Sequence, residues 1–482
     1  MAFYRINSPR REHMQEPYDM VIIGGGPGGY VAAIRAAQLG ARVAIVEKDR
    51  LGGTCLNRGC IPSKAMVRDA EVYRDATSGA YCVHAEGGFQ VNFARLMQRK
   101  REVVDTLVQG VEHLMASKQI RVLAGRGRIV RPGLVEVMGV NGREEVASRA
   151  IIIASGSVPA RLSIPGADLP GVLDSNGLFE LEAQPKSMVV VGASVVGIEF
   201  ACIFGALGTQ ISVLGRRTFL KEAEQQLAKR LRAMLSQRGM AITIGLEFKE
   251  IVRADNGLLR VHYEQGGKLQ YAEGELVLIA TGRWPYTDGL GLDDLGVKMN
   301  ERAIAVNEYL ETNVPGIYAI GDCIGGYMLA HVASYEGEVA AENILGRRRA
   351  ADYRVVPNCI FTMPEIADVG LTEAEAKEAG LDFQASRFPF NVNGRAVAMG
   401  ESEGQVRMIC EKAQEGRGGK VLGVHIMGPQ ASSLIAEAAL AMRLEATAED
   451  IAQTIHAHPT LPEAMMEVAM AQLDGAIHYE HR

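Results

Sequence analysis

Long hydrophobic runs are absent from this sequence. Apolar stretches such as 151–154 and 188–191 are short, whereas a membrane-spanning helix needs about 20 consecutive apolar residues. Charge of one sign is not in excess either, since 51 Lys and Arg face 57 Asp and Glu, a net charge of −6. Such a balance creates no global field that gathers nucleic acid or anionic lipid. We therefore expect no membrane and no nucleic-acid partner, but a small-molecule or protein partner.

Cysteines are few: the 482 residues contain seven, an odd number that does not suit the disulfide framework of a small secreted protein. The first 17 residues include Glu12 and Glu16 and no apolar segment, so no secretory signal is predicted. We expect a soluble, cytoplasmic protein. Only Cys55 and Cys60 are candidates for chemistry. The other five lie in apolar or strand-like contexts and are expected to be small buried residues: Cys82, Cys202, Cys323, Cys359 and Cys410.

A strand, turn, helix, strand unit stands near the start of the chain. Its parts, in order, are a strand at 20–23, Gly24, Gly26 and Gly29, an alanine-rich helix to residue 39, a strand at 42–46, and Glu47. Glycines at this spacing let the backbone approach a pyrophosphate at the N-terminus of the helix, where N–H groups and the helix dipole favour anions. Glu47 can accept both hydroxyls of an adenosine ribose. The unit is typical of dinucleotide binding.

The same pattern recurs in the middle of the chain, with one change at its ribose end. Its parts are a strand at 188–191, Gly192, Ser194 and Gly197, a helix to about residue 207, and a strand at 210–214. Ser194 replaces the middle glycine, and a small residue still permits close approach. The spacing of the first unit places the ribose position at Gly215, which has no carboxylate. Arg216 and Arg217 follow, and because arginine binds phosphate bidentately they favour NADP over NAD; alternatively, both are solvated on a surface turn.

The remainder of the chain predicts a long helix, a further buried strand and a final α+β domain. The expected elements are a helix at 93–118, strands ending at 151–156, a strand at 317–320, then strands at 405–410 and 420–427 and helices at 432–444 and 449–455. Thr447 and Asp450 are spaced like a capping box for the last helix. Gly321-Asp322 resembles the second flavin-contacting motif of two-dinucleotide flavoproteins, in which the Asp binds the ribityl chain. Together with the first unit it implies FAD.

Cys55 and Cys60 directly follow the first nucleotide unit. Two cysteines five residues apart on a regular helix would have Cα atoms roughly 8–9 Å apart, too far for an unstrained disulfide. We therefore expect Cys55 in a distorted turn or loop and Cys60 near the start of the next helix, where the helix dipole stabilises a thiolate. No second ligand pair lies nearby in the sequence, so a zinc site is not predicted.

Several motifs resemble the dihydrolipoamide dehydrogenases of the pyridine nucleotide-disulfide oxidoreductase family. They are the cysteine segment 52–64, Glu199, and the segments 328–331, 361–365 and 456–463, and the similarity covers nearly the whole chain from Asp19. The resemblance implies an α/β fold with two Rossmann-like domains, for FAD and NAD(P), and a C-terminal α+β dimerisation domain in an obligate homodimer. The expected domains are an N-terminal extension 1–18, an FAD-binding domain 19–157, an NAD(P)-binding domain 158–282, a central domain 283–352 that completes the FAD site, and an interface domain 353–482.

The resemblance also implies the catalytic residues. His458 would take the dithiol proton at the partner subunit's disulfide, and Glu463 would orient its imidazole. A histidine suits this task because its pKa lies close to neutral pH, and a carboxylate behind it fixes the tautomer. His456 is expected to serve packing or support, and the bond from His458 to Pro459 to be cis. Lys64 is expected to pair with Glu199 near the flavin, where a cation helps to carry negative charge.

The residues expected to contact the two cofactors follow from the same motifs. For FAD they are Gly24, Gly26, Gly29, Glu47, Lys48, Gly53, Thr54, Lys64, Gly156, Asp322, Met328, Ala330 and His331. For NAD(P) they are Gly192, Ser194, Gly197, Glu199, Arg216, Arg217 and Gly282. No metal is expected. Four residues depart from the family pattern: Arg58 between the cysteines, Ser155 in place of a common Thr, Tyr286 in place of a common Asn, and Pro462 in place of a usual Ser.

The expected function is oxidation of a dihydrolipoyl dithiol, carried by a protein or a small molecule, with reduction of NAD(P). An NADPH-dependent disulfide or mercuric-type reductase is the nearest alternative, since Leu214-Gly215-Arg216 resembles a mercuric reductase nucleotide site, but no cysteine follows Cys410. Glutathione reductase would favour a second Lys at Ser63, and a soluble transhydrogenase would lack the cysteine pair. From a different class, the chain could be a structural or binding subunit of a multienzyme complex.

Overall fold

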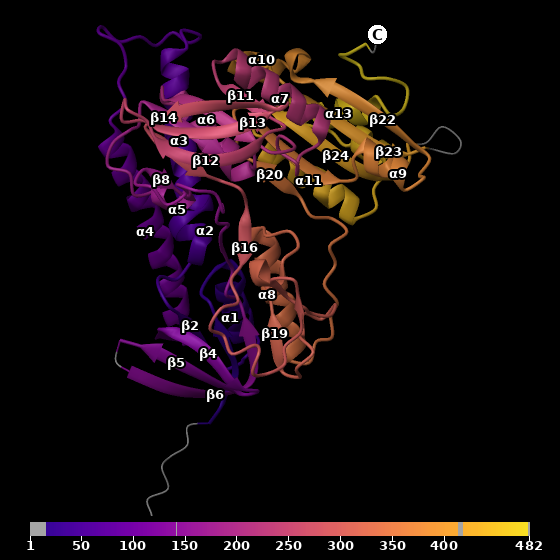
Figure 1. Cartoon of the computed structure of the whole chain (residues 1–482). Helices are drawn as coiled ribbons and strands as arrows, with labels where there is room; N and C mark the ends of the chain where they lie inside the picture. The colour runs from indigo at the N-terminus through magenta and orange to yellow at the C-terminus, as the bar shows by residue number, and fades with distance from the viewer. Residues whose placement is uncertain (1–15, 141, 413–417, 481–482) are drawn as a thin grey trace, which may run out of the picture. The chain divides into compact units, whose positions relative to one another are not determined.

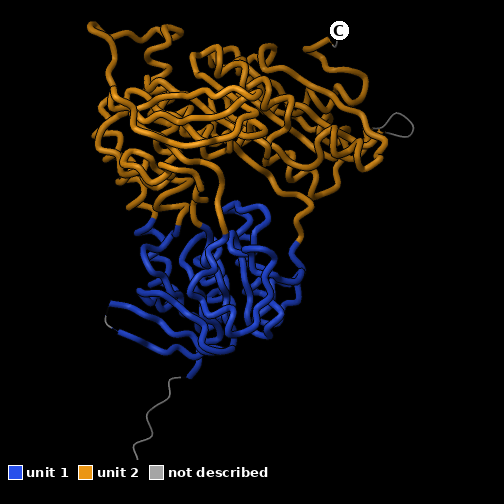
Figure 2. The backbone as a smooth tube through the Cα atoms, in the orientation of Figure 1, with its two compact units in different colours: residues 1–53, 108–157, 285–351 blue, residues 54–107, 158–284, 352–482 orange. Residues whose placement is uncertain are grey.

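The computed structural model describes residues 16–140, 142–412 and 418–480. Nearly all of the predicted extension 1–18 therefore lies outside the described residues. The chain forms two compact units, each assembled from three separate segments (Figure 2). Unit 1 consists of Met1–Gly53, Val108–Ser157 and Pro285–Ala351, and unit 2 of Thr54–Leu107, Val158–Trp284 and Asp352–Arg482. Within the described residues, no helix has the length and apolar character needed to cross a membrane.

Unit 1 is built on a parallel sheet extended by an antiparallel meander (Figure 1). The parallel strands run in the order β3-β2-β1-β6, with β19 on the far side of β6. Strand β1 is buried along nearly its whole length, as expected of a strand covered on both faces. The parallel strands are β1 (Tyr18–Ile23), β2 (Val43–Glu47), β3 (Arg121–Ala124), β6 (Gly142–Ile153) and β19 (Ile317–Ala319). The meander adds β4 (Arg126–Arg131) and β5 (Leu134–Gly139). A separate two-stranded sheet is formed by β17 (Met299–Asn300) and β18 (Ala303–Ile304).

Two helices of unit 1 pack closely against each other through glycines. A Cβ atom on Gly28 would lie 3.0 Å from the Ala333 carbonyl oxygen, and one on Gly337 would lie 2.4 Å from the Gly28 carbonyl oxygen. The absence of side chains at these positions is what permits the contact. The helical segments are α1 (Pro27–Gln38), α8 (Ala330–Ile344), the short 3₁₀ turn η1 (Gly321–Ile324) and the second part of α4 (Phe93–Ser117).

Unit 2 contains a second parallel sheet of the same kind. Its strands run in the order β11-β10-β9-β15-β8, and a separate antiparallel sheet follows with the order β12-β13-β14. The strands are β8 (Val172–Leu173), β9 (Ser187–Val191), β10 (Gln210–Gly215), β11 (Ala241–Ile244), β12 (Glu247–Arg253), β13 (Leu259–Gln265), β14 (Lys268–Gly274) and β15 (Leu276–Ile279). The helices are α2 (Gly53–Arg58), α3 (Cys60–Thr77), α5 (Ser175–Leu178), α6 (Val195–Ala206) and α7 (Gln225–Gln237).

The C-terminal part of unit 2 is the predicted α+β domain. Its antiparallel sheet has the order β20-β21-β24-β23-β22, and a common hydrophobic core joins it to the second parallel sheet through Ile360, Ile366 and Met427. The strands are β20 (Asn358–Ile360), β21 (Glu365–Gly370), β22 (Phe383–Pro389), β23 (Gln405–Glu411) and β24 (Val421–Gly428). The helical segments are α9 (Glu373–Glu378), η2 (Phe390–Val392), α10 (Gly394–Met399), α11 (Ala431–Arg443), α12 (Ala448–Gln453) and α13 (Glu463–Met470). Strands β7 (Ser157–Pro159) and β16 (Arg283–Pro285) form a separate two-stranded sheet.

The predicted elements are confirmed, most of them within two residues of their expected ends. The capping box before α12 is also confirmed: the Asp450 N–H donates to Thr447 Oγ1 at 3.3 Å, and the Thr447 N–H donates to Asp450 Oδ2 at 2.8 Å. This helix is shorter than expected at its C-terminus, because Thr454 adopts an extended backbone with φ −73° and ψ 127°.

Candidate active site

The first glycine turn leaves no room for side chains. Gly24 has φ +111°, and a Cβ there would lie 2.1 Å from the Ala154 carbonyl oxygen; a Cβ on Gly29 would lie 1.9 Å from the Gly24 carbonyl oxygen. Gly26 is the N-cap of α1 and provides no side-chain capping bond. A Cβ on Gly53 would lie 2.6 Å from Gly26 Cα. The absence of a side chain at Gly53 therefore allows the segment after β2 to lie close to the glycine turn. This cradle suits a pyrophosphate at the helix N-terminus.

Glu47 ends β2 with its carboxylate beside this turn. Glu47 Oε2 accepts the Gly25 N–H at 2.7 Å, and Oε1 accepts the Asp49 N–H at 2.8 Å. Each carboxylate oxygen can accept two hydrogen bonds. The carboxylate is therefore fixed in place and suits the role of an acceptor for ribose hydroxyls, which fits the predicted adenosine end of FAD.

The other predicted flavin residues of unit 1 lie in loops and turns that follow β6 and β19. Gly156 has φ +74°, and Asp322 lies in η1, where the Ser157 hydroxyl donates to its carboxylate. Met328 has φ +49°, and Ala330 and His331 open helix α8, whose N-cap Leu329 makes no side-chain bond. Ser157 was missed by the sequence analysis, and no signal in the sequence distinguishes it. The loops lie at the carboxyl ends of parallel strands, where open α/β sheets bind ligands.

The second glycine turn has the same geometry as the first. Gly192 has φ +118°, and a Cβ there would lie 2.2 Å from the Ala280 carbonyl oxygen; a Cβ on Gly197 would lie 2.3 Å from the Gly192 carbonyl oxygen. The Ser194 hydroxyl donates to the Ala280 carbonyl at 2.7 Å and accepts the Gly197 N–H at 3.4 Å. Ser194 is thus the N-cap of α6, a role that the sequence analysis missed because it treated this serine only as a small residue.

The ribose end of the second unit differs from the first for a steric reason. The Gly24 N–H donates to the Val46 carbonyl and the Gly192 N–H to the Leu214 carbonyl, both at 2.8 Å, so Gly215 corresponds to Glu47. A Cβ on Gly215 would lie 2.6 Å from Ile244 Cδ1 and 2.9 Å from Ala193 Cβ. A carboxylate could not be placed there without repacking.

The two arginines that follow are exposed. The guanidinium carbon of Arg216 lies 5.6 Å from the centre of the Phe248 ring, while Arg217 has no ion-pair or ring contact with any described residue. Gly282, the remaining predicted nucleotide residue, is exposed with φ +126°, and a Cβ there would meet nothing within 4 Å.

The cysteine pair spans a break between two helices. Cys55 lies inside the short helix α2, and Cys60 is the first residue of α3, with Gly59 between them at φ −150° and ψ −114°. The expected distorted turn around Cys55 is therefore wrong, because the irregularity lies at Gly59 and Cys55 is itself helical. A Cβ on Gly59 would lie 2.9 Å from the Thr54 carbonyl oxygen, which is why a glycine occupies the break. The position of Cys60 at the start of a helix is confirmed.

Both cysteines are free thiols, and they interact with each other. The Cys55 thiol donates a hydrogen bond to the Cys60 sulfur, which raises the pKa of Cys55. The same bond is the largest cause that lowers the pKa of Cys60, from an ordinary 9.0 to about 7, and the Lys64 ammonium acts in the same direction. Cys60 is therefore the member of the pair that ionises near neutral pH, because a donated hydrogen bond and a nearby cation both favour the thiolate.

The predicted pair of Lys64 and Glu199 is present. Lys64 Nζ lies 2.9 Å from Glu199 Oε2 and 3.1 Å from Oε1. Glu199 is buried on α6 and also accepts the Phe361 N–H at 2.9 Å, and Lys64 Nζ lies 4.2 Å from the centre of the Phe361 ring. Phe361 thus contributes to the pair from the segment before β21, a contact that the sequence analysis missed. These contacts fix a lysine one turn after Cys60 on the same helix.

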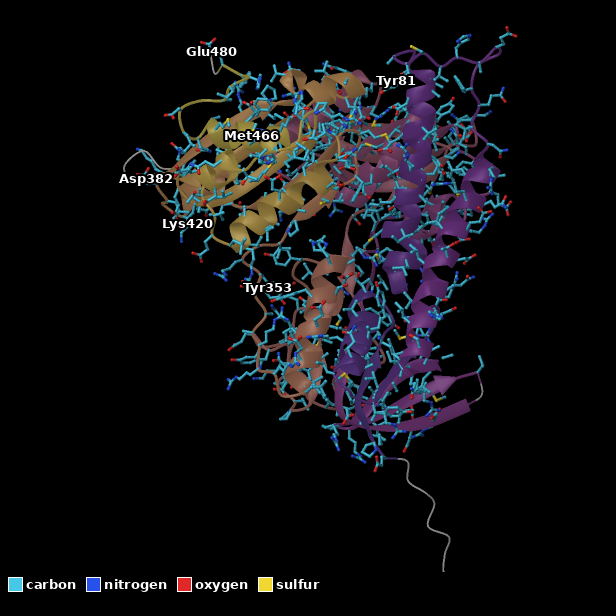
Figure 3. The ribbon with its side chains drawn as sticks, turned by 180° about the vertical axis from the view of Figure 1, so that it is seen from behind. Tyr81, Tyr353, Asp382, Lys420, Met466 and Glu480 are labelled. Atoms are coloured by element: carbon cyan, nitrogen blue, oxygen red, sulfur yellow. The ribbon has the colours of Figure 1, made fainter. Side chains whose placement is uncertain are left out.

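His458 and Glu463 also form the predicted pair. His458 Nδ1 lies 2.8 Å from Glu463 Oε1, and the Thr460 N–H donates to Glu463 Oε2 at 2.7 Å. Burial raises the pKa of Glu463, but these two hydrogen bonds and the nearby imidazole lower it overall, so the carboxyl remains ionised. The bond from His458 to Pro459 is cis, as predicted. The imidazole is 78% exposed, so it is accessible to a substrate or a second chain; Met466 marks the helix that Glu463 opens, α13, in Figure 3.

His456 is held inside the fold, consistent with support rather than chemistry. Its Nδ1 lies 2.8 Å from the Thr454 carbonyl oxygen and its Nε2 lies 2.9 Å from Glu437 Oε1. Both ring nitrogens are occupied and the side chain is only 6% exposed. This histidine therefore ties the segment before His458 to helix α11.

The remaining cysteines follow the prediction with one exception. Cys202, Cys323 and Cys410 are buried and Cys359 is half-buried, but Cys82 is exposed. The expectation for Cys82 was wrong because apolar neighbours in the sequence do not guarantee burial: Cys82 follows Tyr81, labelled in Figure 3, in a segment without helix or strand. Within the described part of the chain, no group of three or more His, Cys, Asp or Glu residues is placed to hold a metal ion.

The chain is similar to known proteins over most of its length. Residues 18–337 match the family model described as "Pyridine nucleotide-disulphide oxidoreductase", and residues 356–469 match the dimerisation domain of the same family. A dihydrolipoyl dehydrogenase from Bacillus subtilis is 40% identical over 480 residues, which cover 97% of this chain and 100% of that protein. A mitochondrial dihydrolipoyl dehydrogenase from Pisum sativum is 39% identical, over 95% of this chain and 92% of that protein.

Solved structures show the same fold. LpdA from Mycobacterium tuberculosis is 27% identical with a TM-score of 0.86, over 94% of this chain and 99% of that one. The flavoprotein disulfide reductase RclA from Escherichia coli is 28% identical with a TM-score of 0.84, over 95% of this chain and 99% of that one. The α/β architecture with two Rossmann-like sheets and a C-terminal α+β domain is thus confirmed. On the evidence of both its sequence and its fold, the chain belongs to the pyridine nucleotide-disulphide oxidoreductase family.

Proposed function

We propose that the chain is a flavin-dependent dihydrolipoyl dehydrogenase that oxidises a dihydrolipoyl dithiol and reduces NAD(P). FAD and a pyridine nucleotide are the cofactors of its family. The observation that carries the proposal is the presence in one chain of a cysteine pair with one acidified thiol and a His458–Glu463 pair with an exposed imidazole. The dihydrolipoyl dehydrogenases at about 40% identity along the full length support the choice of substrate.

The residues of the chain suit a thiol-disulfide exchange. His458 removes a proton from the first substrate thiol, and the resulting thiolate attacks Cys55 of the Cys55–Cys60 disulfide. Cys60 leaves as a thiolate, for which its lowered pKa makes it a good leaving group. The second substrate thiol then loses its proton and displaces Cys55, which regains a proton, so that the substrate becomes a disulfide and the enzyme a dithiol. The chemistry that FAD supplies is two-electron transfer from this dithiol to a nicotinamide.

Reduction by substrate tests this function directly. The purified protein should be yellow, and excess dihydrolipoamide under anaerobic conditions should bleach its flavin absorbance. A structural or binding subunit of a multienzyme complex would not be bleached. Cys55→Ser is the control, because it keeps the fold and the cofactor sites but lacks the sulfur that the substrate attacks. Bleaching of this variant at the wild-type rate would contradict the proposed exchange.

We further propose that the active site is shared between two subunits, with His458 and Glu463 of one chain serving Cys55 of its partner. The match of residues 356–469 to a dimerisation domain supports a homodimer. Mixing inactive Cys55→Ser and His458→Ala subunits tests the arrangement, because each heterodimer keeps one site with both groups intact. Activity should return when subunit exchange is verified by mass. If exchange occurs and no activity returns, the shared site is wrong.

For the nucleotide we propose NADP over NAD. Gly215 carries no carboxylate that could accept the ribose hydroxyls, a side chain there would require repacking of Ile244 and Ala193, and Arg216 and Arg217 follow it on the surface. Replacing both arginines with alanine should raise the KM for NADP much more than the KM for NAD, because only NADP carries a 2′-phosphate. Equal effects on the two nucleotides, or a wild-type preference for NAD above tenfold, would refute the assignment.

An NADPH-dependent disulfide or mercuric-type reductase is the second candidate. The arginines after Gly215 favour it, as does the likeness to a flavoprotein disulfide reductase at 28% identity. Steady-state rates decide between the two: dihydrolipoamide oxidation with NAD or NADP should exceed the reduction of disulfides or Hg(II) by NADPH.

We also propose a lipoyl-bearing protein or small dithiol as partner, a cytoplasmic location, and domain limits at residues 18, 157, 282 and 352.

A further inference from the structure

Tyr286 joins the segment after β16 to the loop after β6, close to the first glycine turn. Its N–H donates to the Gly156 carbonyl at 2.9 Å, and its carbonyl accepts the Ser155 hydroxyl at 2.6 Å. The segment after β16 is thus tied by two hydrogen bonds to the loop after β6. Ser155 and Tyr286 are both departures from the family pattern, and the structure brings them into contact.

The Tyr286 side chain reaches two cations on the same unit. Lys48 Nζ lies 3.8 Å from the centre of its ring, and an Arg126 guanidinium nitrogen lies 3.4 Å from its hydroxyl oxygen. Lys48 directly follows Glu47, whose carboxylate is fixed beside the glycine turn. Neither Lys48 nor Arg126 has an ion-pair partner among the residues that the structure describes.

The residues that contact Tyr286 lie on both sides of the glycine turn at the carboxyl end of β1. The Gly24 N–H donates to the Val46 carbonyl on β2, and the Ala154 N–H donates to the Ile23 carbonyl on β1, both at 2.8 Å. The ends of β2 and β6 therefore flank the glycine turn, with Lys48 on one side and the loop held by Tyr286 on the other. Lys48 and Arg126 have no carboxylate partners in the described ranges of the chain and lie close to the glycine turn. A diphosphate bound there would offset the repulsion between these two cations.

We propose that Tyr286 is a positioning residue for the adenosine diphosphate half of FAD. Its ring holds the Lys48 ammonium by a cation–π contact beside the ribose acceptor Glu47, and its main chain fixes the opposite loop. The ring is the main element, because the contact from Arg126 at 3.4 Å is too long to be a strong hydrogen bond. The proposal rests on the assignment of the first Rossmann unit to FAD.

The rate of FAD release from the holoenzyme tests this role, followed by the rise in flavin fluorescence after dilution. Tyr286→Asn removes the ring, and Lys48→Met removes the charge while keeping the tyrosine and its main-chain bonds. A cation–π contact at a partly exposed site is worth about 0.5–1 kcal/mol, so each variant should release FAD roughly two- to fivefold faster. The double variant should release it no faster than the single variants. Tyr286→Phe, which keeps the ring, is the matched control and should release FAD at the wild-type rate.

The outcomes separate positioning from a merely structural role. The visible spectrum of the bound flavin and the unfolding temperature at saturating FAD should not change, because neither the flavin ring nor the packing of the core is altered. Fast release from Tyr286→Asn with normal release from Lys48→Met, or multiplicative effects in the double variant, would overturn the proposal.

Failure of the enzymatic assignment would look different from failure of this inference. If the variants release FAD at the expected rates but the holoenzyme is not bleached by dihydrolipoamide, only the proposed substrate is wrong. If bleaching occurs and all four variants release FAD at the wild-type rate, only the role of Tyr286 is wrong.

Discussion

Replacement of Cys55 by alanine tests the electrostatics of the thiol pair. Cys60 has a pKa of about 7, and the hydrogen bond from the Cys55 thiol is the largest cause of its lowering. A hydrogen bond to a charged group is worth about 1.5–3 kcal/mol, and because Cys60 is exposed we use the lower limit. That limit corresponds to roughly one pKa unit. In Cys55→Ala the pKa of Cys60 should therefore rise from about 7 to roughly 8.

The assay uses the long-wavelength absorbance that a thiolate beside an oxidised flavin produces. Without Cys55 no internal disulfide can form, so Cys60 can be titrated in the oxidised holoenzyme without a reductant. The absorbance should rise with pH, since only the thiolate donates charge, and its midpoint reports the pKa. Cys55→Ser is the matched control: its hydroxyl stands where the thiol stood and can still donate, so its midpoint should remain near 7.

Two results would refute this reasoning. Equal midpoints in Cys55→Ala and Cys55→Ser would mean that the hydrogen bond does not acidify Cys60. A band that survives in Cys60→Ser after reduction but is lost in Cys55→Ser would mean that the two cysteines have exchanged roles. Adding Lys64→Met to either variant should raise the midpoint further, because the lysine cation is the next favourable influence on Cys60.

Three further predictions concern other parts of the chain. His458→Ala should lower dithiol oxidation by roughly 10²- to 10⁴-fold, as expected for loss of a general base, while the flavin content of the purified protein stays unchanged. Arg216→Ala alone should raise the KM for NADP less than the double replacement with Arg217→Ala, if both guanidiniums bind one phosphate. The buried pair of His425 and Asp368, 2.7 Å apart, has a pH signature: burial lowers the pKa of His425, but the carboxylate raises it overall. Burial raises the pKa of Asp368, so the pair also needs a pH at which this carboxyl is ionised. While Asp368 is ionised, the stabilisation is full below about pH 6.5 and is lost as pH rises through the raised pKa of His425, so the difference in unfolding temperature between wild type and His425→Gln should be larger at pH 6 than at pH 9.

Local constraints explain why the sequence predicted so much of the fold. Gly24 and Gly192 adopt backbone angles that side chains rarely allow, and each would clash with a neighbouring carbonyl if it carried a Cβ. Such requirements appear in the sequence as glycines at fixed spacing, so both Rossmann units could be recognised. The capping box could also be recognised, because its two residues, Thr447 and Asp450, lie only three positions apart. The chemistry of Cys55 was also visible, because its partner lies only five residues away.

Packing between distant segments decided what the sequence could not. A Cβ on Gly215 would lie 2.6 Å from Ile244 Cδ1 on the neighbouring strand β11 and 2.9 Å from Ala193 Cβ, so a side chain there would require repacking. The contact of the Phe361 N–H with Glu199 and that of Lys48 with the Tyr286 ring each join residues more than 150 positions apart. Their partners are set by how strands and helices stack. Spacing along the chain therefore determined which residues carry the chemistry, whereas the tertiary structure determined which groups hold them in place.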